Sequence, residues 1–435
     1  MHTLEQLRSG ALAGTRRLDL SAGLTELPSE VLALADTLEV LNLSGNRLTS
    51  LPPGLSRLKK LKIVFCSDNP FTELPEVLGD CPALEVVGFK ACNITRVPGA
   101  ALPPALRWLI LTDNAIHHLP DALGERPLMQ KLMLAGNRLS ALPGGLAHAE
   151  RLELLRLSAN RFEQLPAWLT ALPRLAWLAL SGNPLGWAVP TPAPLPRMPW
   201  GQLRIGEALG EGASGRISRV QAPGHGTGLA LKLFKGAVTS DGLPEHELAG
   251  SLVAGQHPAL CTPVAELGDH PQGTPGLLLP LIPPGHVHLA GPPSMESCTR
   301  DVYAEGWRIG APQALRLART IAGAVAHLHQ RGVVHGDLYA HNILWNPQSG
   351  EAMLSDFGAA TLLPLGQPEL RRALQALEVR AFGCLLEELV AHAGAGDWPV
   401  WAALDGLARA CLQTDPALRP GMDEAVLALG RVAGG

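Results

Sequence analysis

The sequence predicts a multidomain protein in which an α/β repeat solenoid precedes a separate α+β domain. Three observations lead to the division into two domains, and the fold class of each follows from the family that its motifs resemble, given below. A frame of apolar residues recurs seven times between residues 38 and 185, and a stretch with six prolines follows at 184–204. Beyond the prolines the chain no longer follows the frame. We therefore place the solenoid at 1–187, a Pro-rich linker at 188–200 and the second domain at 201–435.

The recurring frame is Leu-x-x-Leu-x-Leu-x-x-Asn-x-Leu, and its seven copies begin 22 or 23 residues apart. An irregular opening unit at 15–28 brings the total to about eight. Each copy would add one short strand to a shared core, because a single copy cannot bury its apolar face alone. The frame asparagine is expected at a buried turn, where its amide bonds the backbone of neighbouring coils. It is Asn46, Asn69, Asn114, Asn137, Asn160 or Asn183, with Cys92 substituting once.

This frame resembles the leucine-rich repeats, and the resemblance implies a stack whose strands line a concave face. The outward strand positions are unusually apolar for a surface that should meet solvent. We interpret them as a docking groove for a protein substrate or regulator, or for the chain's own second domain. Scattered surface hydrophobes are the alternative. The residues are Val40, Ile63, Phe65, Val86, Trp108, Ile110, Met133 and Trp177.

The prolines of the linker favour extended geometry and a semi-rigid spacer between the two domains. A strap packed on either domain is the alternative interpretation.

The second domain carries four short motifs in order along the chain. A glycine-rich loop comes first, then a strand with a lysine, then a histidine–aspartate motif with an asparagine five residues after the aspartate, then Asp-Phe-Gly. A glycine loop alone is weak evidence, but four motifs in this order make chance implausible. They are Gly210-x-Gly212-x-x-Gly215-x-Ile217, Leu229-Ala230-Leu231-Lys232, His335-Gly336-Asp337-Leu338 with Asn342, and Asp356-Phe357-Gly358.

Together these motifs resemble a eukaryotic-type protein kinase over about 230 residues. The resemblance implies a bilobal α+β fold that transfers the γ-phosphate of ATP to Ser or Thr of a protein. The flanking sequence agrees, because a helical stripe of apolar residues leads into the histidine–aspartate motif. The stripe consists of Leu317, Ile321, Val325 and Leu328.

The resemblance assigns the nucleotide site to the first half of this domain. Glycines let backbone N–H groups approach the phosphates without side-chain obstruction. Lys232 would bind the α- and β-phosphates, held by the carboxylate of Glu247, with Glu245 as the fallback. Leu279 would be the gatekeeper and Leu281 would lie near the adenine. The full nucleotide-binding set is Gly210, Gly212, Gly215, Ile217, Ala230, Lys232, Glu247, Leu279 and Leu281.

The resemblance assigns the transfer chemistry to the later motifs. Asp337 would orient and deprotonate the acceptor hydroxyl. Asn342 and Asp356 would ligate Mg²⁺ through oxygen, as this hard cation requires. The catalytic set is therefore Asp337, Lys232, Asn342 and Asp356, with ATP and Mg²⁺ as cofactors.

The chain also departs from the kinase pattern. Gly336 replaces the arginine that normally grips a phosphorylated activation loop, and Thr361 is the sole hydroxyl between Gly358 and Glu378. Activation-loop control is therefore not expected, and the enzyme would be of the non-RD type. Tyr339 replaces the kinase lysine two residues after the aspartate, so we expect slow transfer, with His341 as a partial substitute cation.

Two other functions remain open at this stage. A pseudokinase scaffold would bind nucleotide but act through protein–protein interaction. A small-molecule kinase would share the His-Gly-Asp-Leu pattern of aminoglycoside- and choline-kinase-like enzymes, although these usually lack the full glycine loop and Asp-Phe-Gly.

Composition sets the outer limits. The net charge of −4 gives no basic footprint for nucleic acid. The longest uncharged stretch, 270–295, is broken by prolines and glycines and is not expected to span a membrane. No signal segment is evident and the seven cysteines are scattered, so a cytoplasmic location is expected. Beyond residue 131 only Lys232 and Lys235 are lysines, which makes Lys232 the first residue to mutate and Lys235 its control.

Overall fold

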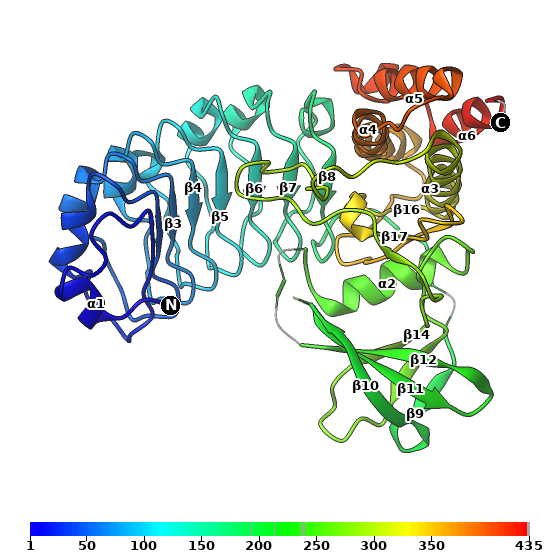
Figure 1. Cartoon of the computed structure of the whole chain (residues 1–435), viewed down its shortest axis with the longest axis horizontal. Helices are drawn as coiled ribbons and strands as arrows, with labels where there is room; N and C mark the ends of the chain where they lie inside the picture. Colours follow the sequence, from blue (N-terminus) through cyan, green and yellow to red (C-terminus); the bar gives the residue numbers. More distant parts are fainter. Residues whose placement is uncertain (193, 213, 236–237, 240, 433–435) are drawn as a thin grey trace. The chain divides into compact units, whose positions relative to one another are not determined.

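The computed structural model describes residues 1–192, 194–212, 214–235, 238–239 and 241–432 (Figure 1). Its contacts divide the chain into two compact units. The first comprises Met1–Arg174 and Asn183–Leu185, and the second comprises Leu175–Gly182 and Gly186–Gly435. The strand of the last repeat therefore belongs to the second unit.

The repeats form a parallel sheet of eight three-residue strands that follow one another in chain order. The central residue of each strand points into the core, and Leu41, Leu109 and Leu132 are fully buried. The fold predicted for this half is confirmed. The strands are β1 (Arg17–Asp19), β2 (Val40–Asn42), β3 (Ile63–Phe65), β4 (Val86–Gly88), β5 (Trp108–Ile110), β6 (Lys131–Met133), β7 (Leu154–Arg156) and β8 (Trp177–Ala179).

Short 3-10 helices return the chain from one strand to the next. Most of them follow a proline whose extended backbone precedes the first helical residue, as at Pro52 and Pro75, and this accounts for the apolar-Pro step in the sequence. Helix α1 (Leu4–Arg8) opens the stack. The 3-10 helices are η1 (Ser29–Leu34), η2 (Pro53–Arg57), η3 (Glu76–Asp80), η4 (Gly99–Ala101), η5 (Asp121–Glu125), η6 (Gly144–His148) and η7 (Leu169–Ala171).

The frame asparagines join adjacent coils as expected. Asn137 Nδ2 donates to the carbonyl oxygens of Leu111 at 2.8 Å and Leu134 at 3.0 Å, and its Oδ1 accepts from Ile116 N at 3.1 Å. Where Cys92 takes this place, its Sγ lies 3.3 Å from Cys66 O. The same ladder of amide contacts recurs at Asn46, Asn69, Asn114 and Asn160.

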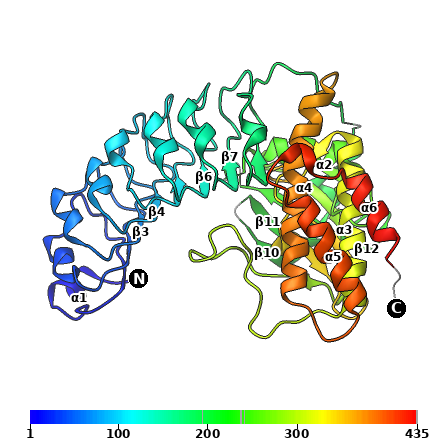
Figure 2. The ribbon, with the colours of Figure 1, turned by 90° about the horizontal axis from the view of Figure 1, so that it is seen from above.

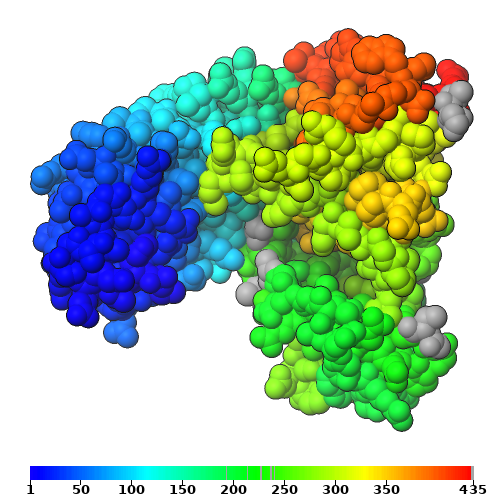
Figure 3. All heavy atoms as spheres, in the orientation of Figure 1, coloured from blue at the N-terminus to red at the C-terminus, as the bar shows by residue number. Residues whose placement is uncertain are grey.

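The second unit contains a six-stranded sheet and one helix, drawn mostly in green in Figure 1; the same part of the chain is green in the space-filling view of Figure 3. Val220, Leu231 and Leu278 form the buried core on one face of this sheet. The strands, in spatial order, are β10 (Arg204–Glu211), β11 (Gly215–Ala222), β12 (His225–Phe234), β14 (Gly276–Pro280), β13 (Ala265–Gly268) and β9 (Arg197–Pro199), with helix α2 (Pro244–Ala254) and the 3-10 helix η8 (Trp200–Gln202).

The linker packs as a strap on both parts of the second unit, rather than as a free spacer. Strand β9 pairs in parallel with β13, with Arg197 opposite Glu266. At the start of the linker, Ala188 O accepts a hydrogen bond of 2.7 Å from the backbone N of Leu365, which lies in the later part of the second unit. Ala193, which also falls in the predicted linker, lies outside the described residues.

The remainder of the second unit is mainly helical, and Figure 2 shows its helices packed side by side. The predicted stripe is confirmed, because Leu317, Ile321, Val325 and Leu328 are fully buried. No helix in the described part of the chain is both long and apolar enough to cross a bilayer. The helices are α3 (Ala311–Arg331), α4 (Pro368–Ala391), α5 (Trp398–Cys411) and α6 (Met422–Gly430), with the 3-10 helices η9 (Ala340–Asn342) and η10 (Pro416–Leu418).

Two small sheets hold the motif-bearing loops of this helical part. One has the strand order β15 (Val287–His288), β17 (Ile343–Trp345), β18 (Ala352–Leu354), and the other pairs β16 (Val333–Val334) with β19 (Thr361–Leu362). One expectation needs correction. On sequence alone, all of 358–378 counts as the segment after Asp-Phe-Gly, but α4 already begins at Pro368 and Glu378 lies in its interior. A proline at the first helical position suits a helix start, because its missing N–H is not needed there.

Candidate active site

Strand register brings much of the predicted nucleotide set onto one face of the six-stranded sheet. Lys232 is opposite Ile217 on one side and Leu277 on the other. Ala230, two residues before Lys232, is opposite Leu279. Because side chains alternate along a strand and register partners share a face, Ile217, Ala230, Lys232 and Leu279 all point to the same side.

The three motif glycines differ in how much space surrounds them. A Cβ at Gly215 would lie 2.5 Å from Leu233 O, so strand packing alone requires glycine there. A Cβ at Gly210 or Gly212 would meet no atom within 4 Å. The space beside these two glycines fits the close backbone approach of a phosphate.

Lys235 is tied to the glycine loop and is therefore not a neutral control for Lys232. Its Nζ lies 2.7 Å from Glu211 Oε1 and donates to Gly212 O at 2.9 Å. The ammonium thus holds two consecutive residues of the loop that carries the motif glycines.

Lys232 forms a buried ion pair with Glu247 on helix α2. Both side chains are about nine-tenths buried, and Lys232 Nζ also lies 5.4 Å from the ring centroid of Phe234. Burial raises the pKa of Glu247 to about 7, against the opposing influence of Lys232. The fallback Glu245 is exposed, so the structure pairs the lysine with the first-choice carboxylate.

Asp337 is held by the asparagine five residues after it. Asn342 Nδ2 donates to Asp337 Oδ2 at 2.7 Å and to Asp337 O at 3.0 Å. This bond uses one carboxylate oxygen and fixes the direction of the other, while the aspartate remains half-exposed. A carboxylate oriented in this way is suited to accept a proton from an incoming hydroxyl.

The loop around Asp337 is joined to the Asp-Phe-Gly segment. Ser355 N and Oγ both donate to Asn342 O, at 2.9 and 2.8 Å, and His335 Nε2 lies 3.0 Å from Ser355 O. Asp356 follows with φ of +64°, an uncommon conformation that aspartate tolerates better than most residues. Its Oδ1 accepts from Gly358 N at 3.1 Å.

The donor set fits Mg²⁺ bound together with a nucleotide. No cluster of three or more His, Cys, Asp or Glu side chains that could hold a metal occurs within the described ranges. Mg²⁺ in phosphoryl-transfer sites commonly takes one or two protein oxygens and completes its shell with phosphates and water. Asn342 and Asp356, linked through Ser355, offer such a pair of oxygens.

Leu279 and Leu281 are both half-buried but differ in position. Leu279 lies within strand β14, opposite Ala230. Leu281 follows the end of β14, and its Cδ1 lies 3.6 Å from where a Cβ at Gly228 would be, beside the β11–β12 hairpin. Only Leu279 is thus placed by strand register on the lysine face.

Gly336 occupies a position that has no room for the usual arginine. Its φ is +73°, and a Cβ there would lie 2.5 Å from Ala359 O and 2.8 Å from Leu178 O. Its N–H donates to Glu378 Oε1 at 2.8 Å, and Glu378 Oε2 lies 2.8 Å from His329 Nε2. The buried Glu378 therefore anchors the backbone just before Asp337.

Two features of the site are not evident from the motifs. His341 is fixed by Asp301, which accepts from its backbone N at 3.0 Å and lies 2.7 Å from its Nδ1. Burial lowers the pKa of His341, but the hydrogen bond and charge of Asp301 outweigh it and raise the pKa overall. Tyr339 is buried beneath Trp177, with the two rings stacked 4.3 Å apart. No sequence pattern links residues so far apart in the chain.

The predicted docking residues are not equally accessible. Val86, Trp108 and Trp177 are buried, whereas Val40, Ile63, Phe65, Ile110 and Met133 are half-buried. Trp108 is covered by its neighbours, since its Nε1 lies 3.3 Å from Met133 Sδ and the Lys131 ammonium lies 4.1 Å from its ring centroid.

Comparisons with known proteins agree with this geometry. Residues 203–373 match the family model of the protein kinase domain. Residues 36–79, 104–162 and 127–185 match leucine-rich repeat models. The chain therefore carries N-terminal leucine-rich repeats followed by a protein kinase domain.

Curated relatives share parts of this arrangement. A probable inactive serine/threonine-protein kinase of Dictyostelium discoideum, roco10, is 33% identical over 27% of this chain and 5% of its own length. The mitogen-activated protein kinase kinase mkk2 of Aspergillus fumigatus is 26% identical over 35% of this chain and 29% of its own. The chain thus spans less than a third of either relative. Among solved structures, a leucine-rich repeat protein of Leptospira interrogans is 30% identical over 39% of this chain and 50% of its own, with a TM-score of 0.34.

Proposed function

We propose that the chain is an ATP- and Mg²⁺-dependent protein serine/threonine kinase. One observation carries this proposal. The same unit holds the buried Lys232–Glu247 ion pair and an Asp337 carboxylate oriented by Asn342. These are the two arrangements that phosphoryl transfer to a hydroxyl needs, one for the nucleotide and one for the acceptor.

Each residue has a role that its environment supports. Lys232 and the backbone beside Gly210 and Gly212 would bind the phosphates, and Asp337 would orient the acceptor hydroxyl and take its proton. Asn342 and Asp356 would hold Mg²⁺. Bound Mg²⁺ would supply positive charge to the phosphate oxygens. The hydrophobic residues Ile217, Ala230, Leu279 and Leu281 would contact the base.

We expect transfer to be slow but present. The lysine that kinases place two residues after the aspartate is here Tyr339, which is buried and uncharged. Loss of one preorganised electrostatic group costs about 10²–10³ in rate, whereas catalysis as a whole is worth roughly 10⁶-fold or more. The remaining groups are therefore sufficient for measurable transfer.

Control by activation-loop phosphorylation is not part of this proposal. The segment between Asp-Phe-Gly and α4 is short, and its hydroxyl, Thr361 Oγ1, is buried and accepts from Leu180 N at 3.2 Å. The glycine at position 336 also leaves no arginine to bind a phosphate there.

The repeats would serve as the docking surface for a protein substrate or regulator, through half-buried apolar residues such as Ile63, Phe65 and Ile110. We place the protein in the cytoplasm, because all seven cysteines lie in the described ranges and no disulfide joins any of them. Boundaries near 187 and 201 would separate the repeats, the linker and the kinase domain.

A pseudokinase scaffold is the second candidate. The buried Tyr339 favours it, as does the similarity to a Dictyostelium protein named as a probable inactive kinase. In that case nucleotide would stabilise the second unit while protein binding would do the work.

Labelled ATP separates the two candidates. The full chain would be incubated with Mg²⁺ and [γ-³²P]ATP, with casein and myelin basic protein as generic acceptors, followed by phosphoamino acid analysis. Phosphoserine or phosphothreonine that disappears in Asp337→Asn, but persists in the surface control Asp405→Asn, supports the kinase. Mg–ATP binding without transfer to any acceptor or to the chain itself supports the pseudokinase.

A further inference from the structure

The strand of the last repeat packs directly on the catalytic loop, the segment His335–Asn342. Residues Leu175–Gly182, which include β8, belong to the same compact unit as this loop. The indole Nε1 of Trp177 donates to Leu338 O at 3.0 Å. Its ring stacks on Tyr339 with an interplanar angle of 7°. Trp177 thus bonds the backbone between Asp337 and Tyr339 and covers the side chain that follows.

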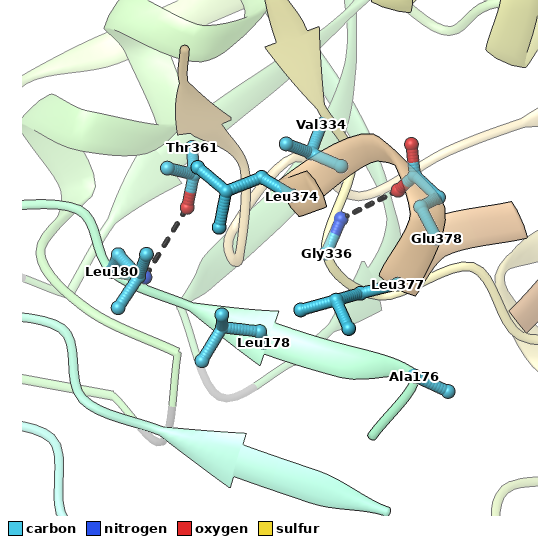
Figure 4. A pocket seen from close by; sticks show the side chains of 9 residues that line it. All are labelled: Ala176, Leu178, Leu180, Val334, Gly336, Thr361, Leu374, Leu377 and Glu378. Atoms are coloured by element: carbon cyan, nitrogen blue, oxygen red, sulfur yellow. Dashed lines mark hydrogen bonds between the residues drawn. The ribbon is translucent and has the colours of Figure 1, made fainter. Parts of the chain in front are cut away.

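The strand makes two further contacts on either side of Trp177. Leu180 N donates to Thr361 Oγ1, which joins the strand to the segment after Asp-Phe-Gly. The carbonyl oxygen of Leu178 lies against Gly336, where it would be 2.8 Å from a Cβ. Figure 4 shows Leu178 and Leu180 of β8 lining one small cavity together with Leu374 and Leu377 of α4.

These contacts form a closely packed joint rather than a ligand pocket. The cavity among Leu178, Leu180, Val334 and Leu377 has a volume of about 10 Å³, at the margin of what one water needs. Apolar side chains packed this closely resist displacement, because separating them exposes their surfaces to water.

From these contacts we propose that strand β8 is a positioning element for the catalytic loop, with Trp177 as its central positioning residue. Gly336 removes the arginine through which kinases couple this loop to a phosphorylated segment. Here Trp177 holds the loop and Leu180 holds Thr361, so strand β8 supplies a restraint on this loop. The role in transfer rests on the proposed function, whereas the restraint on the loop does not.

The geometry favours positioning over inhibition. With β8 seated, Asn342 still orients the Asp337 carboxylate, and the Lys232–Glu247 pair is formed. Asp337 remains half-exposed while Tyr339 beside it is buried. The hydrogen bonds of Trp177 and Leu180 go to a backbone carbonyl and a threonine hydroxyl, and the Trp177 ring stacks on Tyr339; none of these is a group proposed to handle phosphate or proton.

Hydrogen–deuterium exchange of the full chain tests the restraint without relying on activity. Trp177→Ala would be compared with wild type and with Trp108→Ala, which removes a buried tryptophan from the same strand position of an earlier repeat. We expect exchange in peptides covering 335–345 and 358–363 to be at least tenfold faster in Trp177→Ala only. Trp177→Phe keeps the ring stacking and loses the indole donor, so its exchange rate in these peptides should be intermediate. It replaces Trp177→Ala in the test if that variant does not fold.

The outcomes separate this inference from the proposed function. Unchanged exchange in the catalytic loop of Trp177→Ala, or of Trp177→Phe if only that variant folds, overturns the inference. If wild type transfers phosphate, kcat should fall at least tenfold in Trp177→Ala, with KM for ATP within twofold and partial rescue in Trp177→Phe. A rise in kcat would overturn positioning in favour of inhibition. If wild type shows no transfer, the proposed function fails, and the exchange result alone decides whether β8 restrains the loop.

Discussion

The two halves of this chain are stabilised in different ways. In the repeats one contact recurs, since the amide of each frame asparagine ties its own turn to the coil before it. In the kinase domain each contact is unique, as with Gly336 against Leu178 and Glu378, or Lys232 against Glu247. The ladder tolerates a weaker contact at one coil, because Cys92 replaces the asparagine there and contacts the coil before it through its Sγ, 3.3 Å from Cys66 O. A unique contact has no substitute elsewhere in the fold.

The largest expected effect is at Gly336. Alanine there would suffer both the unfavourable positive φ, about 1–2 kcal/mol, and a clash with two carbonyl oxygens that adds about 1–3 kcal/mol. We expect Gly336→Ala to lower the free energy of unfolding of the kinase domain by about 2–5 kcal/mol in urea denaturation. Gly396→Ala is the matched control, because Gly396 has φ of +92° and open space around its Cβ position. Equal losses at the two glycines would show that the strand contact adds nothing.

A smaller effect is expected when one rung of the repeat ladder is removed. Asn137→Ala would leave two buried carbonyl groups and one N–H without their amide partner, at a cost of about 3 kcal/mol. Cys92→Ala removes only a weak thiol contact from the same position of another repeat, so it should cost about 1 kcal/mol. The measurement is the free energy of unfolding of the repeats, obtained from urea denaturation. Similar costs for both variants would contradict the ladder as the main source of coil-to-coil stability.

The third effect concerns nucleotide affinity rather than folding. Glu247→Gln removes the charge that holds Lys232, and charge-assisted bonds are worth about 1.5–3 kcal/mol. We expect Mg–ATP binding, measured by calorimetry, to weaken roughly tenfold or more. Glu245→Gln changes an exposed carboxylate two residues away on the same helix and should leave the affinity unchanged. An unaffected Glu247→Gln variant would remove Lys232–Glu247 from the nucleotide site.

The same carboxylate predicts a pH effect of known sign. Burial raises the pKa of Glu247 from 4.5 to about 7, so the folded protein holds a proton that the unfolded chain releases. Stability should therefore fall as the pH rises between these values. In thermal unfolding of the kinase domain, the stability of wild type relative to Glu247→Gln should fall as the pH rises from 4.5 to about 7. If the stability of wild type relative to Glu247→Gln instead rose with pH, the ion pair with Lys232 would outweigh burial in setting the pKa of Glu247.

Much of the fold could be predicted because its patterns are local. The repeats have a fixed period, and the motifs around Lys232, Asp337 and Asp356 carry their own spacing. Glu247 could be preferred over Glu245, and the structure pairs it with the lysine. These features depend on residues that are close in the sequence or fixed by a recurrent frame.

What the sequence did not reveal depends on contacts between distant segments. The strap formed by the linker depends on the pairing of β9 with the distant strand β13. The start of α4 at Pro368 is the exception, because the proline at its first position is a local signal. The sequence places Trp177 among several groove residues, because only the folded chain brings it to Tyr339. Lys235 was chosen as a control because nothing in its neighbourhood indicates the bond to the carbonyl oxygen of Gly212.

Rapid-quench measurement of a single turnover tests the central claim most directly. The full chain, saturated with labelled Mg–ATP, would be mixed with an acceptor that it phosphorylates, or followed for self-phosphorylation. We predict that wild type transfers the γ-phosphate in one exponential phase, and that Asp337→Asn binds Mg–ATP within threefold of wild type but transfers at least a hundredfold more slowly. Equal transfer by both proteins, or none by wild type despite full nucleotide occupancy, would contradict the assignment of this chain as a phosphotransferase that depends on Asp337.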